Sequence, residues 1–278
     1  MGRVDYKDGS WYEGDVKNGL PNGYGTLQYA NGEKYEGEMR NNEFHGYGTF
    51  WYKDKTWYKG QFKDRQITGK GTMVYPNVNK YTGDFLNGDK NGTGSYYYVD
   101  GSTYFGEFKN NMFHGNGTRI YPNGGKYEGD FVNGVCQGKG TYWYKENSGY
   151  YQGDFVDNLF HGKGVKVYSD GTKYEGDFVK DKENGFGILR FSKGGLYKGN
   201  FVNGLFHGKG DIQYSNGDKY QGDFFEGKLH GYGTFWFYDG TIYRGDFVNG
   251  SMHGNAEVWL PDGRYYKSRF ENNKPVQE

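Results

Sequence analysis

Cysteine, proline and long apolar runs are scarce in this chain of 278 residues. Its single cysteine, Cys136, excludes an intramolecular disulfide, so we expect a reducing, cytoplasmic location. Five prolines against 51 glycines exclude a proline-rich disordered tract. No apolar run approaches the roughly 18 residues of a membrane span. The first residues also lack the apolar segment of a secretory signal, so we expect neither feature.

An excess of one charge is missing too, since 34 basic residues balance 34 acidic ones. Binding to nucleic acid requires a basic excess that neutralises phosphates, so we predict no nucleic-acid partner. The balance also argues against a purely electrostatic attachment to anionic lipid. Aromatic residues are abundant instead, with 30 Tyr and 21 Phe. Disordered chains are poor in aromatics, so we expect a folded protein that buries mainly aromatic faces.

An internal repeat organises the whole sequence. The tripeptide Tyr-x-Gly recurs every 23 residues, except for one step of 24 residues between Tyr127 and Tyr151. A degenerate copy begins at Tyr266. A fixed period of this length indicates a repeat architecture, and we predict one continuous array of about twelve units over residues 1–278, with atypical first and last units. The eleven intact copies begin at Tyr12, Tyr35, Tyr58, Tyr81, Tyr104, Tyr127, Tyr151, Tyr174, Tyr197, Tyr220 and Tyr243.

Each repeat has the pattern of one β-hairpin. Counted from its tyrosine as position 0, positions 0 to 4 alternate between two kinds of residue, which is typical of a strand with two different faces. Positions 13 to 17 form a second β-type run, as in residues 48–52. Dipeptides such as Asn18-Gly19 lie between the runs and favour tight hairpin turns. The sequence therefore predicts an all-β fold, an elongated single-layer antiparallel sheet of stacked 23-residue hairpins.

Alternation assigns the residues of each hairpin to two faces. The tyrosine at position 0, the glycines at positions 2 and 13, and the aromatic residues at positions 4 and 17 share one face with the mostly apolar residue at position 15. We interpret this as the packed face, where glycines allow rings to lie across the sheet. Its residues then serve stability and not recognition.

The opposite face carries an acidic residue at position 3 and a variable residue at position 16, where four of the six tryptophans lie. One interpretation is that this column only covers the sheet. The other is a partner groove with aromatic anchors and an acidic stripe, which would favour a partner with a basic surface, because Trp and Tyr are common binding anchors. The candidate partner-binding residues are Trp51, Tyr97, Trp143, Trp236 and Trp259 in the column, and Asp84, Glu107, Asp130, Asp154, Asp223 and Asp246 in the stripe.

Candidate catalytic chemistry is absent from the repeat pattern. All six histidines occupy position 10, and neighbouring repeats should place them roughly 10 Å apart, too far to share one zinc ion. A nucleophile with its base would require a unique constellation, whereas every candidate here is a repeated one. We therefore predict no catalytic residue, no cofactor and no metal site, and a protein that is not an enzyme.

The motifs Tyr-x-Gly-x-Phe, His-Gly-x-Gly and Asp/Asn-Gly-x-x-Tyr, with His114–Gly117 as one example, resemble the MORN repeat (membrane occupation and recognition nexus). The resemblance spans nearly the whole chain. It implies an all-β rod of stacked hairpins without intrinsic catalysis. Members of this family serve as scaffolds in cilia, basal complexes and membrane junctions. The repeat-only pattern is similar in general to radial spoke head proteins and axonemal MORN proteins.

Several repeats depart from the pattern. Lys55 and Val78 occupy the glycine slot at position 20, one residue is inserted within 145–150, and charges replace the Asn-Gly turn within 179–184. We expect these departures to bend or kink the array. The last repeat is expected to lose its second strand and to end in a charged, proline-bearing segment, which blunts an open sheet edge.

Three functions remain in competition. The first is a structural scaffold for other proteins in a ciliary, axonemal or other cytoskeletal complex, with possible homodimers through sheet edges. The second is a module that binds phosphoinositides on a membrane. The third is a targeting subunit for a separate enzyme. We rank the scaffold first, with a cytoplasmic location on the cytoskeleton of a cilium or flagellum axoneme, because the basic residues are scattered among acidic ones.

Overall fold

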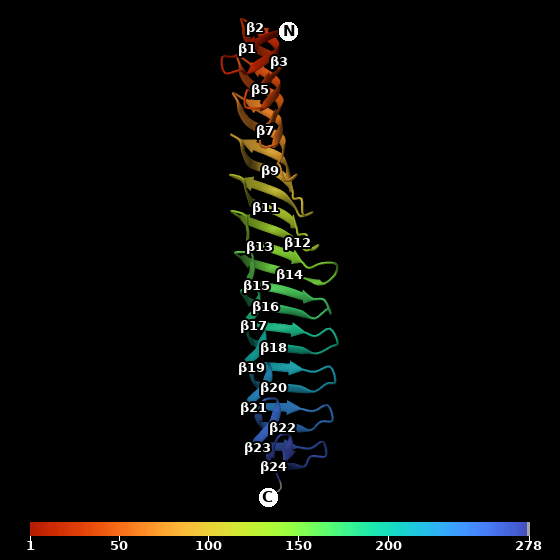
Figure 1. Cartoon of the computed structure of the whole chain (residues 1–278). Coiled ribbons are helices and arrows are strands. Elements are labelled where there is room, and N and C mark those ends of the chain that lie inside the picture. Colours follow the sequence, from red (N-terminus) through yellow and green to blue (C-terminus); the bar gives the residue numbers. More distant parts are fainter. Residues whose placement is uncertain (277–278) are drawn as a thin grey trace. The chain divides into compact units, whose positions relative to one another are not determined.

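The computed structural model describes residues 1–276, which form β-strands and turns and contain no helix that could span a membrane. They form two compact units, Met1–Cys136 and the residues from Gln137 onward, and the division falls within one strand. Figure 1 labels strands of both units along the chain. One continuous array over residues 1–278 therefore stays a prediction.

The first unit contains twelve complete strands and the start of a thirteenth. Their bounds are β1 (Gly2–Asp5), β2 (Trp11–Lys17), β3 (Leu20–Gln28), β4 (Lys34–Arg40), β5 (Glu43–Trp51), β6 (Trp57–Lys63), β7 (Gln66–Val74), β8 (Lys80–Leu86), β9 (Asp89–Tyr97), β10 (Thr103–Lys109), β11 (Met112–Ile120), β12 (Lys126–Val132) and β13 (Val135–Trp143).

The second unit continues from within β13. Its further strands are β14 (Gly149–Val156), β15 (Leu159–Tyr168), β16 (Lys173–Val179), β17 (Lys182–Arg190), β18 (Leu196–Val202), β19 (Leu205–Gln213), β20 (Lys219–Phe225), β21 (Lys228–Trp236), β22 (Ile242–Val248), β23 (Ser251–Trp259), β24 (Tyr265–Glu271) and β25 (Lys274–Pro275).

Within each unit, neighbouring strands pair antiparallel in chain order, as β10 does with β9 and β11. This confirms the predicted all-β class and the 23-residue hairpin as its building block. The turn inside each hairpin has two residues of positive φ, for example Asn18 at 51° and Gly19 at 81°. Two such residues define the type I′ turn that matches strand twist. Lys180 and Asp181 adopt the same turn, with φ of 48° and 69°, so charges at these positions leave its geometry unchanged.

The second strand of each hairpin is sharply bent, which the sequence did not reveal. In β11, Gly117 pairs with Gly106 and His114 pairs with Glu107, so two residues of β11 bulge out between these pairs. Phe44 and Phe50 of β5 show the consequence, because their ring centroids lie 5.8 Å apart. Six residues of straight strand would separate them by about 20 Å. The bend therefore folds each hairpin over its own packed face.

The tyrosines at position 0, here called the tyrosine column, lie under this bend. All eleven are at most 1% exposed. Each hydroxyl donates to the backbone carbonyl of position 3, as Tyr104 does to Glu107 at 2.8 Å. A Cβ at Gly117 would lie 2.5 Å from the Tyr104 hydroxyl, so only glycine admits the ring at this depth. The predicted packed face is thus confirmed, together with its glycines.

The departures from the repeat are absorbed in loops. Lys55 and Val78 adopt the positive φ of the missing glycines, 75° and 62°. The residue inserted within 145–150 stays in the loop before β14, and Tyr151 still pairs with position 15 of the preceding repeat. We had expected the last repeat to lose its second strand, and this expectation is wrong. The repeat keeps the short β25, in which Pro275 pairs with Phe270, because the final hairpin turn at 272–273 is conventional.

Candidate binding surfaces on the two faces of the sheet

The predicted tryptophan column lies on the face opposite the tyrosine column. Strand pairing places position 16 of one repeat beside position −1, the residue before each tyrosine, as with Trp51 and Trp57. Together these positions form one line across the strands of each unit, here called the tryptophan row. The row includes all six tryptophans, and the sequence reasoning had missed Trp11 and Trp57, which strand register alone would have added.

Cations cover several rings of the row. Lys34 Nζ lies 4.8 Å from the ring centroid of Trp51, and Lys80 Nζ lies 4.7 Å from that of Tyr97. Arg244 Cζ lies 5.4 Å from the ring of Trp259. Among the described residues the line includes one acid, Asp5 of β1, which pairs with Trp11 at its end. Along each unit the row consists of Trp11, Gln28, Lys34, Trp51, Trp57, Val74, Lys80, Tyr97, Thr103, Ile120 and Lys126, then Trp143, Tyr150, Val167, Lys173, Arg190, Leu196, Gln213, Lys219, Trp236, Ile242, Trp259 and Tyr265.

The acidic stripe at position 3 runs parallel to this row, about 13 Å away, since four strand residues separate positions −1 and 3. Its carboxylates stabilise the bend by accepting hydrogen bonds from the backbone. Asp84 accepts the backbone N–H of Thr93 at 3.0 Å, and Glu107 accepts that of Asn116 at 3.0 Å. These amides belong to the bulged residues, which have no partner on the first strand of their own hairpin. The stripe therefore has a structural role that sequence reasoning missed.

Lysines at position 12 neutralise part of the stripe. Lys70 Nζ lies 2.9 Å from Asp84, Lys209 Nζ lies 2.7 Å from Asp223, and Lys139 pairs with Asp154. The hydrogen bond from Lys70 and those from Thr93 lower the pKa of Asp84 below its usual value. At Asp130 and Asp246 the backbone carbonyl accepts the hydroxyl of the preceding column tyrosine, at 2.9 and 2.8 Å. Partner binding by the tryptophan column and the acidic stripe stays a prediction.

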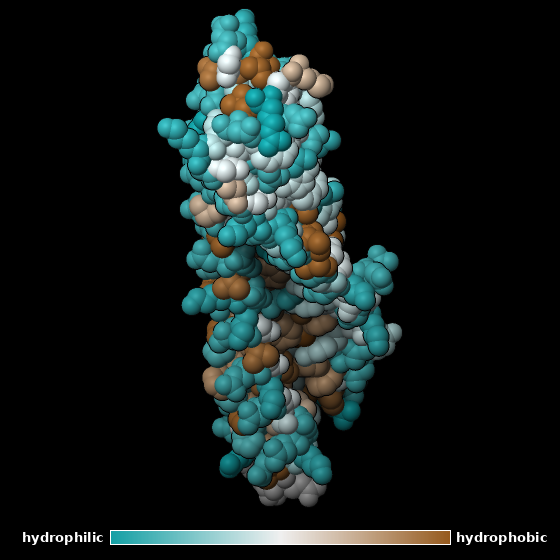
Figure 2. Space-filling view, turned by 45° about the horizontal axis from the view of Figure 1, so that its top comes forward, coloured by the Kyte–Doolittle hydropathy of each residue, from teal (hydrophilic) through white to brown (hydrophobic). Residues whose placement is uncertain are grey.

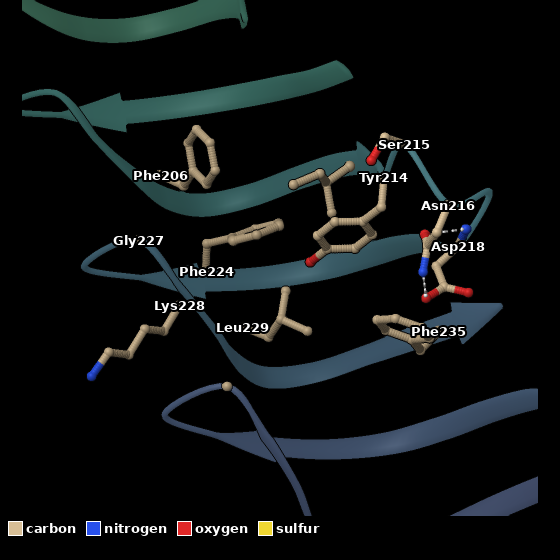
Figure 3. Close-up of a pocket in the computed structure, with 12 residues that line it drawn as sticks. Phe206, Tyr214, Ser215, Asn216, Asp218, Phe224, Gly227, Lys228, Leu229 and Phe235 are labelled. Carbon is tan, nitrogen blue, oxygen red and sulfur yellow. Dashed lines mark hydrogen bonds between the residues drawn. The ribbon is translucent and has the colours of Figure 1, made fainter. Parts of the chain in front are cut away.

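A third surface lies on the packed face, where the bend leaves a groove. In the second unit it forms a pocket of about 700 Å³. Figure 3 shows its aromatic and apolar side chains rising from successive strands, with Lys228 at one end and the turn of Asn216 and Asp218 at the other. Figure 2 shows apolar side chains gathered in a hollow between hydrophilic margins. The main lining residues are Phe206, Ile212, Tyr214, Phe224, Leu229 and Phe235.

The groove depends on position 9, which the sequence reasoning left out of the packed face. Phe206 occupies this position, stacks on Tyr197 at a centroid distance of 3.8 Å, and lies only 5.8 Å from Phe224. Tyr214 and Phe235 stack at 6.0 Å along the open side. The signal in the sequence was the recurring Phe before His-Gly at Phe44, Phe113, Phe160 and Phe206.

The histidines lie at the bulge, apart from the groove. The backbone carbonyls of His114, His161, His230 and His253 accept hydroxyls of the tyrosine column, as His161 accepts Tyr151 at 3.1 Å. Across residues 1–276, no group of three or more His, Cys, Asp or Glu side chains is placed to hold a metal ion. Burial raises the pKa of Cys136 to about 11, so its thiol is protonated at neutral pH.

Comparison with solved structures gave only weak similarities. A search among curated proteins gave no match. Among solved structures, the chain is similar to a mutant of the TCP10 domain of Danio rerio CPAP, at 10% identity and a TM-score of 0.31, covering 97% of this chain and 100% of that one. It is also similar to the SAS-4 (dCPAP) TCP domain of Drosophila melanogaster, solved with a proline-rich motif of Ana2, at 15% identity and a TM-score of 0.29, covering 74% and 90%. Scores this low carry no argument about function.

The match to a family model is far more extensive. The model described as MORN repeat matches residues 12–34, 35–57, 58–77, 81–103, 104–126, 127–148, 151–173, 174–196, 197–219, 220–242 and 243–263. These segments begin at the tyrosine column and cover well over half of the chain. Proteins of this kind are generally non-catalytic scaffolds. The chain belongs to the MORN repeat family.

Proposed function

We propose that this chain is a non-catalytic scaffold that binds other proteins through the groove on its packed face. The observation that carries the proposal is the pocket of about 700 Å³ in the second unit, which is lined by aromatic side chains and has polar groups at both ends. Protein interfaces favour such a combination, because buried rings supply affinity and the polar ends fix orientation.

Site-specific photocrosslinking in native cells tests this proposal. A photoreactive amino acid replaces Ser215 or Lys228, which are both exposed at the margins of the pocket. The matched control places it at the exposed Lys163 on the opposite face. We expect the same protein to be captured from both groove positions and not from Lys163, where only a partner of the separate acidic stripe would be captured. Equal capture from all three positions, or none from the groove, would contradict the proposal.

The tryptophan row is a second proposed protein-binding surface, with the acidic stripe beside it. Half-exposed rings such as Trp51 and Trp259 can anchor a partner, and the carboxylates of the stripe favour a basic one. Since the row carries several lysines and, among the described residues, an acid only at its β1 end, a basic partner would have to contact the stripe while its apolar groups cover the row.

We further propose that the scaffold belongs to a ciliary or flagellar axoneme, in a complex similar to a radial spoke head, on the cytoskeleton of the cytoplasm. This finer proposal rests on the family resemblance of the repeats alone. Expression of the tagged chain in a ciliated cell tests it. Signal along the axoneme that survives detergent extraction supports the proposal, and diffuse signal that is lost on extraction argues against it.

Homodimers through sheet edges are a related proposal, which rests on the outer side of β1 and on the part of β24 that the short β25 leaves uncovered among the described residues. Sedimentation velocity at two concentrations tests it. A monomer at the higher concentration counts against it.

Membrane binding is the alternative function, and the tryptophan row is the observation that favours it. Trp, Tyr and Lys, with the acidic Asp5 only at the β1 end of the row, suit the interface of an anionic bilayer. Against it, Lys34 and Lys126 pair with Glu36 and Glu128 at 2.8 and 2.9 Å in the adjacent row. Sedimentation with liposomes containing acidic phosphoinositide decides between the functions. Strong binding that salt weakens would place the membrane first.

A further inference from the structure

Charged residues replace apolar ones at four places along the groove. Positions 9 and 15 are apolar in most repeats, with Phe44 and Phe50 as one example. The first unit has Lys90 at position 9 and, one repeat later, Arg119 at position 15. The second unit has Lys166 at position 15 and, one repeat later, Glu183 at position 9.

The two pairs differ in how they are satisfied. Lys166 Nζ lies 3.1 Å from Glu183 Oε1, and the Tyr168 hydroxyl donates to the same carboxylate. The buried charges of the second unit therefore neutralise each other. The two cations of the first unit have no such carboxylate within ion-pair distance in the part of the chain that the structure describes.

Lys90 and Arg119 instead contact aromatic rings. Lys90 Nζ donates to the Tyr75 hydroxyl at 3.1 Å and lies 5.7 Å from the ring centroid of Tyr96. Arg119 Cζ lies 4.8 Å from the ring centroid of Tyr121, and its Nε is buried without a hydrogen-bond partner. A buried guanidinium nitrogen without an acceptor is unfavourable unless a ligand supplies one.

Both cations line the same pocket, which has a volume of about 380 Å³ and includes Tyr98 and Phe113 but no acidic residue. The acidic side chains that interact electrostatically with these two cations already accept hydrogen bonds from other groups. Asp89 accepts the side-chain amide of Asn111, and Asp100 accepts the backbone N–H and the hydroxyl of Ser102. The pocket is thus a cationic, ring-walled site within the groove.

We propose that the pocket between Lys90 and Arg119 binds the carboxylate of an acidic side chain on a peptide segment that lies in the groove. The inference rests on the proposed protein-binding function and specifies the chemistry of its partner. Charge complementarity selects an anion. The two cations have no carboxylate partner in the described part of the chain and lie among aromatic rings, so an anion is the ligand that would stabilise them. Two cations bind one carboxylate, and the rings beside them accept its apolar neighbours.

Peptide selection followed by paired measurement tests the inference. Peptides of about twelve residues, a length that would span a few repeats in extended form, are selected from a random display library on the whole chain. Dissociation constants are then measured for each synthetic peptide and for its Glu→Gln or Asp→Asn counterpart. We expect the acidic form to bind about tenfold to a hundredfold more tightly, as a charge-assisted hydrogen bond in a desolvated site requires.

Residues from the same columns provide the variants. Lys90→Phe with Arg119→Leu introduces residue types that other repeats have at these positions, so the fold should persist, and the preference for the acidic peptide should disappear. Lys166→Leu with Glu183→Phe is the matched control in the second unit and should keep that preference. Far-UV circular dichroism and the melting temperature verify folding of both double variants.

The outcomes separate this inference from the proposed function. Peptides that crosslink to the groove but bind equally well as acid and amide overturn the carboxylate site and leave groove binding intact. Failure to select any groove-binding peptide overturns both. Tighter binding of inorganic phosphate, or of phosphatidylserine vesicles, than of any acidic peptide at the wild-type pocket also overturns the peptide carboxylate as its ligand.

Discussion

The tyrosine column and the tryptophan row lie on the same strands but on opposite faces, and they differ in uniformity and burial. The column has the same residue in eleven repeats, almost without exposure, with a hydroxyl that always donates to the same carbonyl position. The row changes from repeat to repeat and stays half-exposed. The difference indicates that identical positions carry stability, and we propose that recognition belongs to positions which vary.

Alkaline pH should have the largest effect, because it removes the stability that the buried tyrosine column provides. Burial raises the pKa of every tyrosine in the column, that of Tyr243 to about 12, whereas an unfolded tyrosine titrates near 10. Since the folded pKa is the higher one, this stability is fully present below about pH 10 and is lost as pH rises through 12. Eleven such groups give a slope of up to about 15 kcal/mol per pH unit. We expect cooperative unfolding between pH 10 and 12, followed by circular dichroism together with tyrosinate absorbance. Gradual tyrosinate formation in a folded protein would contradict this expectation.

Truncation of one column residue should be the most damaging single substitution. Tyr104→Ala removes a fully buried ring that stacks on Phe113 at 3.8 Å, and it leaves a cavity. We expect a loss of about 3–5 kcal/mol in the free energy of unfolding, measured with urea. A loss below about 1 kcal/mol would mean that neighbouring repeats collapse into the gap.

Truncation in the tryptophan row should have the opposite effect, with a small loss of stability and a large loss of partner binding. Trp236→Ala with Trp259→Ala removes half-exposed rings, so each change should cost less than about 2 kcal/mol, while partner capture should fall about tenfold or more. Pull-down and melting temperature measure the two effects. Intact binding together with a large loss of stability would assign the row to structure alone.

Val78 gives the smallest expected effect, because the strain lies in a loop outside both surfaces. Its φ of 62° is unfavourable for a β-branched side chain and ordinary for glycine, which holds this slot in most repeats. Val78→Gly should stabilise the protein by about 1 kcal/mol. Gly101→Val, in the same slot of the next repeat, is the matched control and should destabilise it by a similar amount. Equal melting temperatures for the three proteins would show that the loop relaxes.

The sequence predicted the strands, the turns and the tyrosine column, because each depends on local alternation and on residues such as Asn18-Gly19 that encode one turn. The bend could not be predicted from the sequence. Two bulged residues between Gly117 and His114 change which faces meet, and no alternation pattern records this. Three features follow from that bend: the groove at Phe206, the structural role of Glu107, and the pocket that Lys90 and Arg119 both line. The tryptophans were correctly placed on one face, but cross-strand register was needed to bring Trp57 beside Trp51.

Removal of one hydroxyl from each of two tyrosines in the same repeat tests the central claim most directly. Tyr220 is buried in the column and donates to the carbonyl of Asp223 at 2.9 Å, whereas Tyr232 is 54% exposed at position 12. In urea unfolding, Tyr220→Phe should lower the free energy of unfolding by about 1–2 kcal/mol, because a buried carbonyl loses its donor. Tyr232→Phe should change it by less than about 0.5 kcal/mol. Equal effects of the two substitutions would contradict the claim that the uniform column carries the stability of the fold.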